Sequence, residues 1–210
     1  TNALFLDMAM VVANLGRFDE SDGLLRRAAP IIERSPSPVE RARLATYRAN
    51  ISALRGDYIA ARSEASDAVA QWRAIADARP VTDDTALARG EMAMALNLEA
   101  FVLMRSGDTT SANVLASQAL LALAAAPATP VWWRADIMGV LGETSLSDGR
   151  LAAAETYFKT AIRIRKDAFG EGAGTLRLRT ALARAYQAEN MNTNAIIANV
   201  ENENVFHDDD

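Results

Sequence analysis

The side chains that most often carry out catalysis are sparse in this 210-residue chain and form no recognisable catalytic set. Nucleophilic catalysis needs a hydroxyl or thiol group held beside a base. The chain has no cysteine, and its single histidine, His207, lies in an acidic C-terminal stretch far along the chain from Ser35, Ser106 and Ser145. The sequence therefore predicts no catalytic residue, and we expect a protein that is not an enzyme.

Carboxylates and glycines that resemble ligand-binding motifs have simpler interpretations. The pair Asp83-Asp84 suits the start of a helix, and Asp208 to Asp210 form a solvated acidic end that lacks the rigid geometry of a metal site. The glycines of Gly170-Glu-Gly-Ala-Gly174 follow a predicted helix, whereas a phosphate-binding loop follows a strand. We expect no metal and no cofactor.

Charge and hydropathy limit the classes of partner. The formal net charge is −5 and the isoelectric point is about 5.0, so the chain lacks the positive field that attracts nucleic acid. The most apolar run, residues 119–126, is much shorter than the roughly 20 residues of a membrane span. We expect no nucleic-acid partner, no membrane contact and a cytoplasmic location. The absence of cysteine is neutral about compartment.

One stretch defines the elements that would position any binding residues. Residues 140–161 contain a glycine, Gly149, between two segments with helical spacing of apolar residues. Small residues lie seven positions before it, at Gly142, and five and twelve positions after it, at Ala154 and Ala161. Small side chains at these positions let two antiparallel helices approach closely. The stretch predicts a helical hairpin.

The same pattern recurs along the chain, with predicted turns at Gly16, Gly56, Gly107, Gly149 and Asn190. The pattern predicts an all-α, right-handed superhelical solenoid of about five antiparallel hairpins, over residues 2–34, 37–78, 82–126, 129–169 and 172–206. We treat 1–206 as a single repeat domain and 207–210 as an acidic tail.

Capping residues support these boundaries. Ser37 and Pro38 suit the first positions of a helix, Thr82 suits the cap of the next hairpin, and Pro80 and Pro127 are predicted to end helices. The fifth copy is the weakest. Counting from Asn190 places Ala183 and Ala195 in the small positions, and the last segment fits either a fraying cap or a truncated boundary.

The segment from Gly149 to Gly170 resembles a tetratricopeptide repeat (TPR) of the roughly 42-residue type found in kinesin light chain and in many bacterial proteins. The resemblance rests on the Gly-Arg turn, the Ala-Glu pair at 154–155, and an Ala-rich helix that ends in Ile-Arg and a Phe-Gly loop. Asn97 also resembles the first asparagine of that family's Asn pair, but the second is replaced by Leu98.

The resemblance implies a concave groove lined by the first helix of each hairpin, which binds a protein or peptide partner. The family's groove positions fall here on Asn50, Asn97, Phe101, Arg105, Glu143, Arg177 and Arg184, together with Met94, Met104 and Asp136. The lysines and asparagines that clamp a C-terminal carboxylate in chaperone-binding relatives are not reproduced, since Leu6 and Met10 occupy the first such positions.

Each binding assignment has a structural alternative. Met94, Met104 and Phe101 at helical spacing also suit a helix core. Arg177 and Arg184 also suit a solvated face, as does the stretch 159–184, which holds seven basic side chains against two acidic ones. That stretch can attract an acidic peptide or face the acidic tail. Trp132-Trp133 is expected to pack against the preceding helix.

The leading hypothesis from the sequence is a non-enzymatic scaffold that holds a peptide or a helix of a partner. Two alternatives remain. The first residue is Thr1 rather than methionine, which suggests a fragment of a larger bacterial protein and a regulatory segment attached to a caspase-like peptidase or a Ser/Thr kinase. The other alternative is a small-peptide-sensing regulator. Partner identity and oligomeric state do not follow from the sequence.

Overall fold

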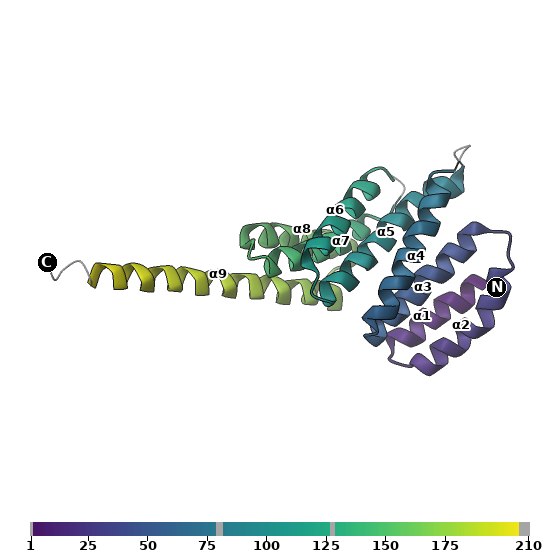
Figure 1. The fold of residues 1–210 in the computed structure, drawn as a ribbon, viewed down its shortest axis with the longest axis horizontal. Helices are drawn as coiled ribbons and strands as arrows, with labels where there is room; N and C mark the ends of the chain where they lie inside the picture. Colours follow the sequence, from purple (N-terminus) through teal and green to yellow (C-terminus); the bar gives the residue numbers. More distant parts are fainter. Residues whose placement is uncertain (1, 79–81, 127–128, 206–210) are drawn as a thin grey trace.

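The computed structural model describes residues 2–78, 82–126 and 129–205, and within them it contains helices and no strand. Eight helices pair into four antiparallel hairpins that stack side by side, and a ninth helix follows them (Figure 1). The hairpins are α1 (Asn2–Asn14) with α2 (Phe18–Glu33), α3 (Pro38–Arg55) with α4 (Tyr58–Ala76), α5 (Asp83–Arg105) with α6 (Thr109–Ala124), and α7 (Val131–Ser147) with α8 (Leu151–Phe169). The prediction of an all-α repeat solenoid is confirmed.

Glycine forms each of the four hairpin turns. Gly16, Gly56, Gly107 and Gly149 all have a left-handed backbone, with φ between 71° and 89°. Residues with a Cβ atom are disfavoured in this conformation, so glycine is the residue that lets one helix end and the next begin after two or three residues.

The predicted small positions lie at the centre of each hairpin. Eleven of these twelve residues have no exposed surface, namely Ala9, Ser21, Ala28, Ala49, Ala61, Ala68, Ala100, Ala112, Ala119, Ala154 and Ala161. The twelfth, Gly142, is also buried, and a Cβ atom there would lie 2.5 Å from the ring of Phe158. The hairpins therefore pack as closely as the sequence predicts.

Side-chain caps fix several helix starts. The Ser37 hydroxyl accepts a hydrogen bond from the amide of Glu40, with Pro38 in the first turn. Thr82 and Thr85 form a reciprocal capping box at the start of α5, which has 23 residues and is long, as the 51-residue spacing of its turn from Gly56 predicts. Pro80, Pro127, His207 and Asp208 to Asp210 lie outside the described residues.

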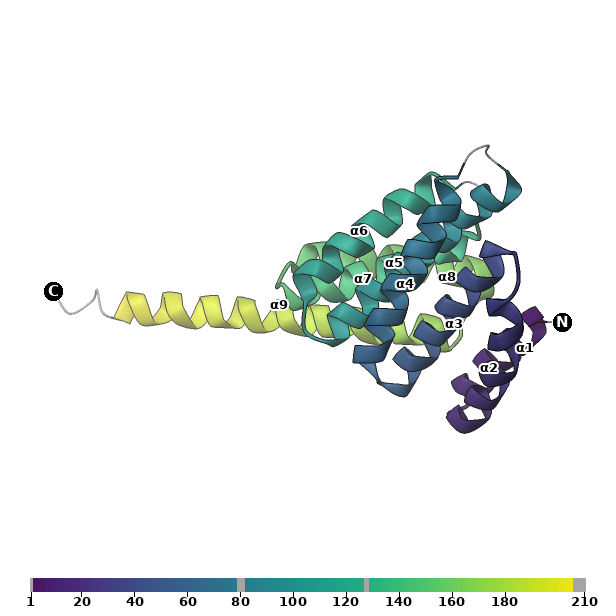
Figure 2. The ribbon, with the colours of Figure 1, turned by 45° about the vertical axis from the view of Figure 1, so that its right-hand side comes forward.

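The predicted fifth hairpin is wrong. The chain from Ala173 to Val205 is one continuous helix, α9, whose C-terminal half extends beyond the stacked hairpins in both ribbon views (Figures 1 and 2). No glycine or proline interrupts residues 175–205, so nothing in this segment favours the left-handed turn that the other hairpins use. Among residues 173–193 of α9, Ala181 and Ala185 are buried, whereas Ala183 is exposed.

The hydrophobic core consists of successive clusters along the stack. One cluster joins α1, α2 and α3, a second joins α3 to α7, and a third joins α7, α8 and α9. Trp72 and Phe158 are its largest fully buried side chains. Because each hairpin packs mainly on its neighbours, the stack presents extended faces, as repeat proteins do.

Candidate partner-binding groove

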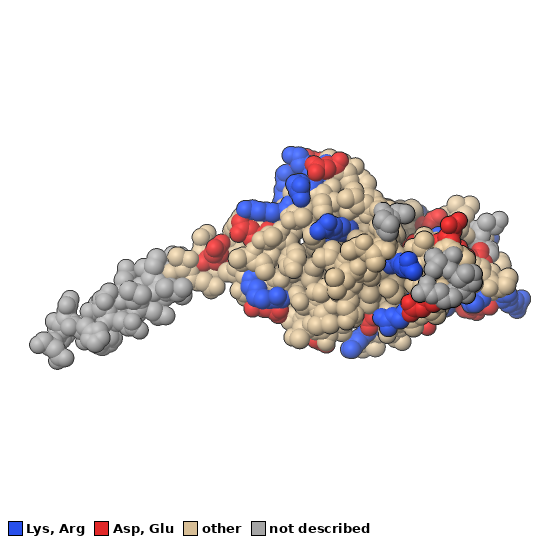
Figure 3. All heavy atoms as spheres, turned by 90° about the horizontal axis from the view of Figure 1, so that it is seen from above, with Lys and Arg blue, Asp and Glu red and all other residues tan. Residues whose placement is uncertain are grey.

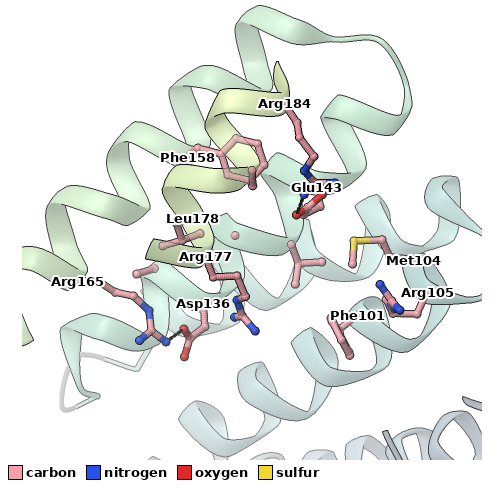
Figure 4. Close-up of a pocket in the computed structure, with 14 residues that line it drawn as sticks. Phe101, Met104, Arg105, Asp136, Glu143, Phe158, Arg165, Arg177, Leu178 and Arg184 are labelled. Atoms are coloured by element: carbon pink, nitrogen blue, oxygen red, sulfur yellow. Dashed lines mark hydrogen bonds and ion pairs between the residues drawn. The ribbon is translucent and has the colours of Figure 1, made fainter. Parts of the chain in front are cut away.

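A groove of about 280 Å³ lies between α5, α7 and the first turns of α9. Figure 4 shows that α5 contributes Phe101, Met104 and Arg105, while α7 contributes Asp136 and Glu143. The remaining lining residues are Ala135, Gly139, Val140, Phe158, Arg165, Arg177, Leu178, Ala181 and Arg184. Five of the seven predicted binding residues therefore line one groove: Phe101, Arg105, Glu143, Arg177 and Arg184.

Helix α7 holds its two groove carboxylates through cross-helix ion pairs. Asp136 accepts a hydrogen bond from Arg165 of α8, and Glu143 accepts one from Arg184 of α9. The Asp136–Arg165 pair is mostly buried, with side-chain exposures of 21% and 22%, while Arg184 is 53% exposed. These pairs neutralise two of the four groove arginines and fix the carboxylates against the wall.

Arg177 differs from Arg165 and Arg184. It is exposed, lines the groove and forms no ion pair with any residue that the structure describes. Figure 4 shows it reaching into the groove from α9 between the two ion pairs. Its guanidinium group is therefore available to an anionic group that enters the groove.

Arg105 is held in a different way at the other wall. Its Nε donates a 3.0 Å hydrogen bond to the Tyr58 hydroxyl, and its guanidinium carbon lies 5.6 Å from the centre of the Tyr58 ring. This contact positions the cation without neutralising it. The groove thus holds four guanidinium groups and two carboxylates.

The groove floor is apolar. Phe101 and Met104 are half-buried and pack against the central core cluster, while Val140 and Leu178 are buried. The sequence left open whether Phe101 and Met104 belong to the core or to the groove. Both side chains pack against the core cluster and also line the groove.

The two predicted asparagines lie outside the groove lining. Asn97 is buried on α5, one turn before Phe101, and its Oδ1 has no hydrogen-bond partner among the described residues. Asn50 is half-buried on α3 and donates a 2.9 Å hydrogen bond to the carbonyl oxygen of Thr46. Neither side chain meets Arg177 in one site.

Sequence reasoning missed Arg165, Phe158 and Leu178 as lining residues. Arg165 and Phe158 lie on α8, a second helix of its hairpin, whereas the prediction used first helices only. The opposite charges of Asp136 and Arg165 could have indicated that Arg165 lies near the groove. Whether the two side chains meet, however, depends on how α7 and α8 cross, which the sequence does not give.

The basic stretch 159–184 is largely paired in the structure. Five of its basic side chains lie within ion-pair distance of a carboxylate: Lys159, Arg165, Lys166, Arg179 and Arg184. Figure 3 shows one face of the molecule, on which basic and acidic side chains lie beside one another around a mostly uncharged area. No continuous positive surface is visible on that face.

The two tryptophans have separate environments. Trp133 packs against the central core cluster and lies close to Gly90 of α5. The Trp132 ring lies 5.8 Å from the Phe169 ring at the end of α8. The sequence predicted that both rings pack against the preceding helix, whereas the contacts found here are with α5 for Trp133 and with α8 for Trp132.

Comparison with known proteins identifies the repeat and the fold. Residues 134–172 match the model of the tetratricopeptide repeat family. Over the whole chain, the structure is similar to BtubC (BKLC) from P. vanneervenii, with a TM-score of 0.67, 16% identity, and coverage of 100% of this chain and 83% of that one. A comparison with curated proteins finds no match.

A second similar structure contains the nearly identical TPR-like repeats of a kinesin-light-chain type protein from Podosopora anserina. The TM-score is 0.63 at 18% identity, over 92% of this chain and 89% of that one. The predicted resemblance to tetratricopeptide repeats is confirmed in sequence for residues 134–172, and the resemblance to kinesin-light-chain-type repeats is confirmed in fold.

Two further observations bear on function. None of the helices in the described ranges is long and apolar enough to cross a membrane. Across the same residues, no three His, Cys, Asp or Glu side chains gather as a metal-binding group. Repeats of this fold generally mediate contacts between proteins.

Proposed function

We propose that this TPR-like chain is a non-enzymatic, cytoplasmic scaffold whose groove between α5, α7 and α9 binds an extended acidic segment of a protein partner. The proposal rests mainly on Arg177. Its guanidinium group lines the groove beside an apolar floor and has no ion-pair partner among the described residues. Residues 1–206 act as one repeat domain in this proposal.

The charge balance of the groove supports an acidic ligand. Two of its four arginines are paired with Asp136 and Glu143, so the lining carries an excess of two positive charges. The protein as a whole is negative, with a formal charge of −5, and it will repel an acidic segment except where positive charge is concentrated. The groove is such a place.

The apolar floor supports a ligand that also carries an apolar side chain. Phe101, Met104 and Val140 lie on the α5 and α7 sides of the groove, opposite Arg177 on α9. Extended peptides present alternate side chains to opposite sides, so one residue can contact the arginine while its neighbour contacts the floor. Asn50, which is half-buried on α3, is proposed to pair with the backbone of a longer ligand, whereas the buried Asn97 is assigned no ligand contact.

The same lining gives no support to an enzymatic role. Its side chains are arginine, carboxylate and apolar groups, and neither carboxylate is free of an ion pair. Nucleophilic catalysis requires a nucleophile and a base within hydrogen-bond reach of each other. Peptide binding is therefore the function that the groove chemistry favours.

Selection of peptides on the intact protein tests the proposal. A phage library of random peptides is selected on the wild-type chain, and the affinities of enriched peptides are measured by fluorescence polarisation. We expect enriched peptides to carry Asp or Glu next to an apolar residue, and to bind Arg177→Ser at least about tenfold more weakly, the loss typical of a hydrogen bond to a charged group.

Arg163→Ser is the matched control, because Arg163 is an exposed arginine of the same basic stretch that does not line the groove. It should leave the affinity unchanged. Enrichment of peptides without acidic residues, or equal losses for both variants, would contradict the proposed groove.

A further inference from the structure

Helix α9 forms one wall of the groove and carries two of its four arginines. It contributes Arg177, Leu178, Ala181 and Arg184 to the lining, and Figure 4 shows both arginines reaching into the groove from this helix. The rest of the lining belongs to α5, α7 and α8. The position of α9 therefore sets both the width of the groove and the place of Arg177.

One face of α9 is buried in the same way as a face of α7. The two helices occupy equivalent places in the repeat at an offset of 41 residues, which is the spacing between Gly149 and Asn190. The stripe that faces the preceding hairpin is buried in both helices: Ile137, Val140 and Thr144 in α7, and Leu178, Ala181 and Ala185 in α9. Helix α9 is thus docked in the position of a further first helix.

A second face distinguishes α9 from α7. In α7, Ala135 and Gly142 are buried, and Gly142 lies against Phe158 of α8. The equivalent residues of α9, Leu176 and Ala183, are exposed, Leu176 to 66%. Within the described part of the chain, α9 is therefore held from one side, whereas α7 is held from two.

The contacts that hold α9 in place are small or lie at the surface. Among residues 173–193, the buried apolar side chains are only the leucine and the two alanines of the stripe. The hydrogen bonds to α7 and α8 are those from Arg184 to Glu143 and, at 2.9 Å, from the Tyr186 hydroxyl to Glu155. Exposed polar contacts stabilise little, and segments with few buried contacts open before the rest of a fold. We therefore expect α9 to be the wall of the groove that opens most readily.

The connection from α8 to α9 has the features of a hinge. Gly170 ends α8 with a left-handed φ of +73°. Gly174, in the first turn of α9, rests directly on Arg165, because a Cβ atom at Gly174 would lie 2.5 Å from Nη1 of that arginine. With no side chain at Gly174 to interlock with Arg165, the first turn of α9 can pivot on the flat guanidinium group.

Docking of α9 also brings like charges together in the groove. It places Arg177 and Arg184 beside the groove that already holds Arg105 and Arg165, and of these four only Arg165 and Arg184 are paired with carboxylates among the described residues. The excess of two positive charges opposes docking. An anion between the walls offsets this repulsion, so that docking of α9 and binding of an anion favour each other.

We propose that α9 is a movable wall of the groove, which undocks from α7 and α8 about residues 170–174 and is closed by an acidic ligand. The acidic ligand rests on the proposed function, whereas the undocking rests on the packing of α9. In the undocked state Arg177 and Arg184 leave the groove. The ligand therefore binds the docked state and shifts the population toward it.

Thiol labelling of single-cysteine variants measures undocking directly, because the chain has no native cysteine. Ala185→Cys places a thiol in the buried stripe of α9 and outside the groove lining, while Ala116→Cys places one at a fully buried position of α6. Each thiol reacts with a disulfide reagent only while it is exposed. We expect Ala185→Cys to react at least about tenfold faster than Ala116→Cys, since α9 opens separately from the rest of the stack. Equal rates would overturn the proposal.

Hydrogen exchange of the wild type makes the same comparison without a substitution. Amides of residues 178–188 should exchange faster than those of residues 135–147 in α7, because an undocked helix has only its own weak stability. Equal protection of the two segments would also overturn the proposal. Circular dichroism melting checks that both cysteine variants retain the fold.

An acidic peptide selected on the wild type tests the coupling between binding and docking. A ligand that binds only the docked state slows the labelling of Ala185→Cys by a factor of 1 + [L]/Kd, about elevenfold at ten times Kd. The same peptide with its acidic residue replaced by Lys is the control and should leave the rate unchanged.

The outcomes separate this inference from the proposed function. A peptide that binds and leaves the labelling rate unchanged would overturn the movable wall, while the proposed function would stand. If no acidic peptide is enriched, the proposed function fails and the closure by ligand fails with it. The labelling rates of the ligand-free variants then still decide whether α9 undocks.

Discussion

At the scale of single residues, close helix packing depends on a glycine that has no side chain at the contact. Gly142 lies against Phe158, and a Cβ atom at Gly142 would approach three ring carbons to 2.5, 2.7 and 2.9 Å. The ring is fully buried and cannot move away without disturbing its neighbours. The sequence pattern identified Gly142 as a contact position, but only the structure shows which side chain fills the space.

We predict that Gly142→Ala destabilises the protein by about 1–3 kcal/mol, because the added methyl group overpacks the core. The control is Gly23→Ala in α2, where, apart from the local helix backbone, an added Cβ meets only a guanidinium nitrogen of Arg26 at 3.9 Å. That change should stabilise the helix by about 0.5–1 kcal/mol. Urea denaturation measures both. Equal effects of the two substitutions would contradict the close packing.

Burial also sets the ionisation of a carboxyl group on α5. Burial raises the pKa of Glu91 above its ordinary value of 4.5, and the nearby Arg43 opposes this effect only in part. The folded state therefore holds this proton more tightly than the unfolded chain. The stabilisation from Glu91 is present below pH 4.5 and is lost as pH rises through the raised pKa.

We predict that Glu91→Gln is more stable than the wild type at pH 7, and that the difference shrinks as pH falls toward 4. Glu155→Gln should show the opposite sign at pH 7, because hydrogen bonds from Lys159 and Tyr186 lower the pKa of Glu155. Melting temperatures over a pH series measure both trends. A pH-independent difference for Glu91→Gln would exclude this ionisation effect.

At the scale of elements, four of the five predicted hairpins follow from the glycines at their turns. The sequence succeeded there because each glycine is followed by small residues at fixed distances, a strong local signal. The turn predicted at Asn190 does not form, because the repeat spacing there is not accompanied by a turn glycine. The chain around Asn190 has no turn residue strong enough to stop the helix, so α9 continues.

Gly56→Ala isolates the contribution of turn conformation. Gly56 has a φ of +84° and no atom within 4 Å of an added Cβ, so the expected loss of about 1–2 kcal/mol comes from the backbone alone. Gly172→Ala is the control, since that position is equally open and its φ is not in the left-handed region. Thermal unfolding compares the two. A harmless Gly56→Ala would show that the turn tolerates a side chain.

At the scale of the whole molecule, hairpin stacking brings residues from α5, α7 and α9 to one groove. The family resemblance predicted Phe101, Arg105, Glu143, Arg177 and Arg184 as binding positions because the first helices line the inner wall of such stacks. It did not predict which arginines are already paired. That distinction depends on the distances between Asp136 and Arg165 and between Glu143 and Arg184, which neighbouring helices set.

In the proposed function, Arg177 recognises an acidic group of a partner, and a charge exchange between protein and peptide tests this contact. The affinity of one selected acidic peptide, and of the same peptide with its key Asp or Glu replaced by Lys, is measured against the wild type and Arg177→Glu. We predict that the wild type prefers the acidic peptide and that Arg177→Glu prefers the lysine peptide, with a coupling between the two changes of roughly tenfold or more. The same order of preference for both proteins would contradict the claim.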